Sequence, residues 1–175
     1  MLIGYRGCGK TTVGRLLADR LSARFVDTDE RVVAEAGRSI ADIFATEGEA
    51  GFRRRESRVV AQLASSHPPD TDPPIVISLG GGAILDHANL TRLKAGARVV
   101  WLTCSPDVLH ARITADAAGA SSRPALTVGG IDEVRTILAQ REPLYRRFAD
   151  LTISSQDRSP EDLVADIVAW RTANP

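Results

Sequence analysis

The sequence predicts an α/β fold, with a parallel β-sheet covered by helices on both faces. Short apolar runs of strand length alternate with helical patterns along the whole chain. The run at 75–79 is apolar throughout, which is typical of a strand covered on both faces. A length of 175 residues suits one domain, and no linker or internal repeat divides it. We therefore expect a single α/β domain over residues 1–175.

Each expected element follows from its own local pattern. Strands are expected at 2–3, 25–26, 75–79, 99–102 and 151–153. Helices are expected at 11–21, before a C-cap at Gly37, between a cap at Ser39 and a break at Gly48, through 52–65, at 85–94, from Pro106, at 131–149 with a kink or break at Pro143, and at 160–170. The proline-rich tract 66–74 predicts a surface loop, and the Ala, Gly and Ser-rich tract 115–130 predicts a mobile flap.

Composition argues against several classes of protein. Lys plus Arg and Asp plus Glu both total 22, so no net charge attracts nucleic acid or an anionic membrane. Cys8 and Cys104 lie far apart and form no zinc-binding pattern, which favours a reducing cytoplasm. No stretch approaches the ~18 apolar residues of a membrane span. We expect a cytoplasmic monomer without nucleic-acid or membrane partners.

The segment GYRGCGKT at residues 4–11 matches the phosphate-binding pattern G-x-x-x-x-G-K-[ST]. Its backbone N–H groups would surround a β-phosphate, Lys10 would reach the β and γ oxygens, and the Thr11 hydroxyl would ligate Mg²⁺. Glycines let the backbone approach the phosphate closely. The alternative is a chance glycine turn before a helix, but the strand before it and the helix after it favour a P-loop NTPase fold.

Two acidic residues, Asp27 and Asp29, follow the strand at 25–26. In extended geometry this spacing places both carboxylates on one side. One could hold the metal while the other receives the proton of an attacking hydroxyl, as phosphoryl transfer requires. The alternative is a solvated acidic turn that caps the next helix.

Four further features are ambiguous when taken singly. The arginines at 53–55 point about 100° apart on a helix, so at most two can address one site. The glycines at 80–82 could let a ligand sit against the backbone or form a loose connection. Arg123 could close over phosphates or lie on the surface, and Arg141 could pair locally.

Together these segments resemble the shikimate kinases, and the resemblance extends over nearly the full chain. The matching segments occur in the family's order: 4–11, 25–29, 37–44, Glu49 with 52–54, 80–82, 123–124 and 141–145. The resemblance implies a nucleoside-monophosphate-kinase-like fold with a five-stranded parallel sheet, a substrate-binding region at about 29–56 and a lid at about 115–130. It also implies transfer of the γ-phosphoryl group of MgATP to the 3-hydroxyl of shikimate.

The resemblance also implies roles for individual residues. Expected at the nucleotide are Gly4, Gly7, Cys8, Gly9, Lys10, Thr11, Thr12, Arg112, Arg123 and Pro160. Expected at the substrate are Asp29, Phe44, Phe52, Arg53, Gly80, Gly81, Gly82, Pro124 and Arg141. Thr11 and Asp27 would serve the metal, and Lys10, Asp29 and Arg123 would be catalytic.

Two rival functions remain at this point. One is a related kinase for gluconate or a nucleoside monophosphate. The paired arginines and the glycine turn argue against it, because they favour a compact carboxylate substrate. The other is a nucleotide-binding regulator without catalysis, which would not require Asp29 and Arg123. We also hypothesise that Cys8, near a helix N-terminus, has a lowered pKa and is alkylated readily without nucleotide. The alternative is that Cys8 is an inert filler.

Overall fold

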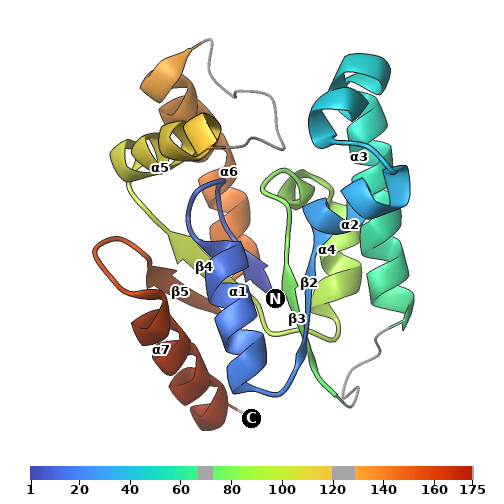
Figure 1. Cartoon of the computed structure of the whole chain (residues 1–175). Helices are drawn as coiled ribbons and strands as arrows, with labels where there is room; N and C mark the ends of the chain where they lie inside the picture. Colours follow the sequence, from blue (N-terminus) through green and yellow to red (C-terminus); the bar gives the residue numbers. More distant parts are fainter. Residues whose placement is uncertain (67–72, 120–128, 175) are drawn as a thin grey trace.

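The computed structural model, which describes residues 1–66, 73–119 and 129–174, has one parallel sheet between two layers of helices (Figure 1). The five strands are β1 (Leu2–Ile3), β2 (Arg24–Asp27), β3 (Ile75–Ser78), β4 (Val100–Thr103) and β5 (Leu151–Ser154), in the order β2-β3-β1-β4-β5. All four pairings are parallel. The α/β class and the five-stranded parallel sheet are thus confirmed.

Helices follow the strands and cover both faces of the sheet (Figure 1). They are α1 (Lys10–Arg20), α2 (Thr28–Ala36), α3 (Ile40–Ser66), the short 3₁₀ helix η1 (Ala83–Leu85), α4 (His87–Lys94), α5 (Pro106–Gly119), α6 (Gly130–Phe148) and α7 (Pro160–Ala173). Because every strand runs in the same direction, the carboxyl ends of all five meet at one edge. Ligands bind at this edge in open α/β sheets.

Two hydrophobic clusters, one on each face of the sheet, form the core. Successive strand residues alternate between them: Leu2 and Val100 belong to the cluster that packs against α1 and α7, whereas Ile3 and Trp101 belong to the cluster that packs against α3, α4 and α6. This alternation explains the continuous apolar runs in the sequence, since side chains on both faces of each strand are buried.

Local signals set several helix boundaries. Gly37 ends α2 in the left-handed region, with φ 65°. The Ser39 hydroxyl accepts a hydrogen bond from the Asp42 backbone N–H at 3.1 Å and so caps α3, and Ser159 caps α7 through Asp162 in the same way. Gly48, with φ 66° and ψ −177°, kinks α3 where the sequence predicts a break. The expected C-cap at Gly37, cap at Ser39 and interruption at Gly48 are thus confirmed.

Two expectations differ from the structure. The tract expected to form a mobile flap from residue 115 begins with the last turn of α5, which continues to Gly119, while residues 120–128 lie outside the described part of the chain. Helix α6 runs through Pro143, so a break is wrong, while the alternative of a kink stays a prediction. Pro143 and Ala139, whose carbonyl loses its helical donor, both lie on the exposed side of α6, where solvent can reach that carbonyl.

Candidate functional site

The loop between β1 and α1 leaves the start of a helix open to a ligand. Gly4, Gly7 and Gly9 have φ values of 145°, 83° and 93°, which side chains with a Cβ rarely adopt. A Cβ on Gly4 would also lie 2.5 Å from the Leu102 carbonyl oxygen. Gly9 precedes α1, its cap has no side-chain hydrogen bond, and the first turn holds no acidic residue. The N–H groups and positive end of α1 can therefore serve an anion.

Lys10 lies across this loop. Its Nζ donates hydrogen bonds to the carbonyl oxygens of Gly4 at 2.9 Å and Tyr5 at 3.0 Å, and the residue is only 9% exposed. The Lys10 ammonium group is thus held at the loop by hydrogen bonds to two neutral carbonyl oxygens. It could exchange these for phosphate oxygens, which are stronger acceptors.

Asp27 links the loop to the next strand. Its Oδ2 accepts a hydrogen bond from the Thr11 hydroxyl at 2.7 Å, and its Oδ1 accepts one from the Asp29 backbone N–H at 2.9 Å. Asp27 therefore caps α2, as the alternative interpretation expected, but it is buried and not solvated, and it also contacts the phosphate-binding helix. Its expected metal-binding role stays a prediction. Asp29 lies in the first turn of α2 and not in extended backbone. The argument that extended geometry places the Asp27 and Asp29 carboxylates on one side was therefore wrong.

Both carboxylates nevertheless line one cavity of about 830 Å³. The sequence-predicted residues that line it are Gly7, Cys8, Gly9, Lys10, Thr11, Thr12, Asp27, Asp29, Gly81, Arg112 and Pro160. The Arg112 guanidinium donates to the carbonyl oxygens of Gly7 and Ser155, both at 3.3 Å. This places Arg112 and Pro160 at the same cavity as the phosphate loop, which suits the expected nucleotide.

The glycine turn after β3 is where the other predicted residues meet. A Cβ on Gly80 would lie 2.7 Å from Asp29 Oδ1, and one on Gly82 would overlap the Arg53 guanidinium. Gly81 offers its carbonyl oxygen, which accepts a hydrogen bond from Arg141 Nη1 at 3.0 Å. The turn lacks side chains because one carboxylate and two guanidinium groups approach its backbone.

Of the expected aromatic and lid residues, the structure describes only the aromatic ones. The rings of Phe44 and Phe52 pack with centroids 5.1 Å apart, and the Arg53 guanidinium lies 5.3 Å from the Phe52 centroid. Phe52 is buried in the core beside Arg53, so it supports the site from behind. Arg123 and Pro124 lie outside the described residues.

Glu56 is a site residue that sequence reasoning missed. It is 2% exposed, and its Oε2 accepts a hydrogen bond from Arg53 Nη1 at 2.7 Å. Burial alone would lower the pKa of Arg53, but Glu56 and Glu49 together raise that pKa overall. The spacing of three residues between Arg53 and Glu56 on one helix was the available signal.

Tyr145 was also missed as a site residue. Its hydroxyl donates a hydrogen bond to the Gly81 carbonyl oxygen at 3.0 Å, beside Arg141, and burial raises the pKa of this hydroxyl well above its usual value. Tyr145 therefore stays neutral and acts as a donor. It fixes the carbonyl against which Arg141 is held.

Cys8 does not have the properties expected of a reactive thiol. It is fully buried, and burial raises the pKa of its thiol although Lys10 acts in the opposite direction. The hypothesis of a lowered pKa is therefore wrong, because its side chain points into the apolar core rather than toward the helix N-terminus. Cys8 is a small buried filler of the loop.

The described residues also bear on metal clusters and membrane spans. Within residues 1–66, 73–119 and 129–174, no group of three or more His, Cys, Asp or Glu side chains could hold a metal ion. In that same part of the chain, no helix has both the length and the apolar character needed to cross a membrane.

Comparisons with known proteins agree with this geometry. The shikimate kinase family profile matches residues 6–172. The chain is 44% identical to the shikimate kinases of Rhodopirellula baltica, over 95% of this chain and 87% of that protein, and of Symbiobacterium thermophilum, over 96% and 92%. Its structure resembles shikimate kinase from Acinetobacter baumannii in complex with shikimate, with a TM-score of 0.88, 36% identity and coverage of 99% and 92%. A gluconokinase from Sinorhizobium meliloti shares the fold, with a TM-score of 0.57 and 16% identity.

Proposed function

The chain belongs to the shikimate kinase family, and from this premise we infer that it transfers the γ-phosphoryl group of ATP to the 3-hydroxyl of shikimate. The observation that carries the inference is the meeting of Asp29, Arg53 and Arg141 at the glycine turn, next to the phosphate loop. A small hydroxylated anion needs a carboxylate acceptor for its hydroxyls and guanidinium groups for its carboxylate. The gluconokinase shares only the fold, at 16% identity.

At the nucleotide, the loop at residues 4–9 and the open N-terminus of α1 would hold the phosphates, with Lys10 on the β and γ oxygens. The short contact between the Thr11 hydroxyl and Asp27 fits a Mg²⁺ site, since both are oxygen ligands at the loop. A bound Mg²⁺ would neutralise charge on the phosphates. Arg112 and Pro160 would flank the base.

At the acceptor, Arg53 and Arg141 would bind the substrate carboxylate while Asp29 accepts hydrogen bonds from its hydroxyls. Asp29 would then orient the attacking oxygen and take its proton during transfer. Gly80, Gly81 and Gly82 would let the ring approach the backbone, and Phe44, Phe52 and Pro124 would bound the pocket. Arg123 would act on the phosphates from the lid. We also propose that the protein works as a cytoplasmic monomer, which its two free cysteines fit.

The test is ADP release measured with MgATP and a panel of acceptors: shikimate, gluconate and nucleoside monophosphates. We expect turnover with shikimate to exceed turnover with every other acceptor by at least about 10³, because only shikimate satisfies both arginines and Asp29. Comparable rates with gluconate or a monophosphate would overturn the substrate assignment. ATP binding without turnover on any acceptor would instead favour a regulator.

A further inference from the structure

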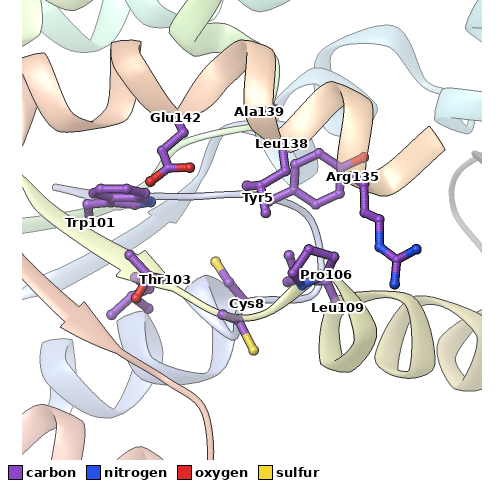
Figure 2. Close-up of a pocket in the computed structure, with 12 residues that line it drawn as sticks. Tyr5, Cys8, Trp101, Thr103, Pro106, Leu109, Arg135, Leu138, Ala139 and Glu142 are labelled. Atoms are coloured by element: carbon purple, nitrogen blue, oxygen red, sulfur yellow. The ribbon is translucent and has the colours of Figure 1, made fainter. Parts of the chain in front are cut away.

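A second cavity of about 300 Å³ lies between β4, α5 and α6 (Figure 2). It has no place in the proposed reaction, and among the residues that the structure describes only Cys8 lines both this cavity and the larger one. Its walls are mostly apolar and aromatic, and several are almost completely buried: Tyr5 is 2% exposed and Trp101 is 4% exposed. Cavities of this size and character are typical of small-molecule sites.

Two hydrogen-bond donors, the Tyr5 hydroxyl and the Trp101 indole N–H, belong to residues that line this cavity. In the described part of the chain, no residue accepts a hydrogen bond from the Trp101 indole N–H or from the Tyr5 hydroxyl. The indole lies at one end of the cavity, and the Tyr5 hydroxyl lies toward Arg135 at the other (Figure 2). A ligand with acceptor atoms could therefore receive a hydrogen bond from each of these two groups.

The cavity also has opposite charges at its two ends. Arg135 and Glu142 both extend from α6 and are seven residues apart, which is two turns or about 10 Å along the helix axis (Figure 2). Arg135 has ion pairs with Asp107 at 3.4 Å and Asp132 at 3.2 Å, but both acids are highly exposed, so these contacts are weak. The guanidinium can therefore accept a better-placed anion.

We propose that this cavity binds a small planar aromatic anion. Its ring would lie among Tyr5, Trp101 and Leu138, and its anionic group would face Arg135 and the Tyr5 hydroxyl. A second acceptor on the ring would receive the Trp101 N–H. The anionic end is assigned to Arg135 because the Trp101 end holds the Glu142 carboxylate, which already occupies the Arg146 guanidinium at 2.7 Å.

An occupant would contact the phosphate loop from behind. Tyr5 and Cys8 belong to that loop and form part of the cavity wall, and the Tyr5 carbonyl oxygen accepts a hydrogen bond from Lys10. Binding in the cavity should therefore change nucleotide affinity without competing for the nucleotide site. By linkage, each ligand must change the affinity of the other by the same factor.

The test uses the aromatic anion 1-anilinonaphthalene-8-sulfonate as a fluorescent probe, with the full chain saturated by MgADP and shikimate. We expect saturable fluorescence that persists under these conditions. Ala139→Phe, at the exposed side of the cavity, should abolish it by filling the space. Gln140→Phe adds the same ring one residue away, outside the lining, and should leave it unchanged. Arg135→Gln should raise the probe Kd at least about tenfold.

Two results would overturn the proposal. One is an apparent probe Kd that rises in proportion to the concentration of MgADP or shikimate without reaching a plateau, because such competition would place the probe in the reaction site. The other is equal fluorescence from Ala139→Phe and Gln140→Phe, which would place the probe elsewhere on the surface. Circular dichroism and ADP binding show whether each variant is folded.

Discussion

At the scale of single residues, the site depends on side chains whose charge and position are fixed by close neighbours. Asp29 lies against the Gly80 backbone, and Arg53 is held by Glu56. Neither arrangement has room for a longer side chain, but in both the charge can be removed by a substitution that keeps the shape of the side chain. Substitutions that remove charge alone can therefore separate chemistry from packing.

Asp29→Asn should lower kcat by ~10²–10⁴, because the amide keeps the shape of the carboxylate but cannot take a proton. The Kd for MgADP should stay within about twofold, measured by calorimetry beside steady-state ADP release. Glu30→Gln is the matched control, since Glu30 is the next residue of α2 and is exposed. Full activity of Asp29→Asn would remove Asp29 from the mechanism.

Arg53→Ala should chiefly raise the KM for shikimate, by about 10-fold to 100-fold, through loss of a charge-assisted contact. Arg54→Ala, one position along and exposed, should change KM little. Arg53→Ala should also destabilise the fold, because it removes the guanidinium that pairs with the buried Glu56 carboxylate.

The double variant Arg53→Ala with Glu56→Gln separates the two effects of Arg53. It removes the buried charge, so the midpoint of urea unfolding should return toward that of the unmodified chain while the KM stays raised. Recovery of both quantities together would mean that Arg53 only supports structure. A change in ATP affinity alone would mean that Arg53 was assigned to the wrong ligand.

Cys8 should be alkylated more slowly than Cys104 in the folded protein. A pKa raised by burial leaves less thiolate at any given pH, and the thiolate is the reactive form. Iodoacetamide labelling at pH 8, followed by mass spectrometry of both peptides, measures the two rates. In denaturant the two cysteines should react at similar rates. Faster labelling of native Cys8, suppressed by MgATP, would restore the rejected hypothesis.

At the scale of helices and strands, local sequence predicts most boundaries, because both faces of each strand are buried and the caps at Gly37, Ser39 and Ser159 act within a few residues. The continuation of α5 to Gly119 was missed because alanine-rich sequence suits both helix and flap. Glu56 was missed because its burial depends on a turn 24 residues further along. The spacing of three residues from Arg53 indicates a pair on one helix face, but it does not distinguish a buried pair from a solvated one.

Gly48→Ala should destabilise the fold by about 1–3 kcal/mol, since its φ of 66° and ψ of −177° lie in a region that is essentially restricted to glycine. No atom lies within 4 Å of the place where a Cβ would go, so the cost is backbone strain alone. Gly37→Asn is the control, because asparagine tolerates the left-handed C-cap. Urea unfolding measures both, and equal midpoints would show that the kink does not need Gly48.

At the scale of the whole molecule, parallel strand order assembles the site from distant segments. The loop after β1, the start of α2 after β2 and the glycine turn after β3 share one edge because β1, β2 and β3 are neighbours in the sheet. Arg141 reaches the same edge from α6. The motifs predict which chemistry is present, but only this topology brings the nucleotide residues next to the acceptor residues.

If the nucleotide residues and the acceptor residues form two distinct halves of one site, MgADP and shikimate should each stabilise the fold when bound alone. MgADP at 100 times its Kd should add about 2.7 kcal/mol, which for a chain of this size raises the Tm by roughly 5–11 °C. Lys10→Met should abolish most of that shift while preserving the shift caused by shikimate, because Lys10 contacts the loop and not the glycine turn. Differential scanning fluorimetry with each ligand alone measures both shifts. Loss of both in Lys10→Met would show that the acceptor half depends on the nucleotide half, contrary to the separate contacts that hold Asp29, Arg53 and Arg141 in place.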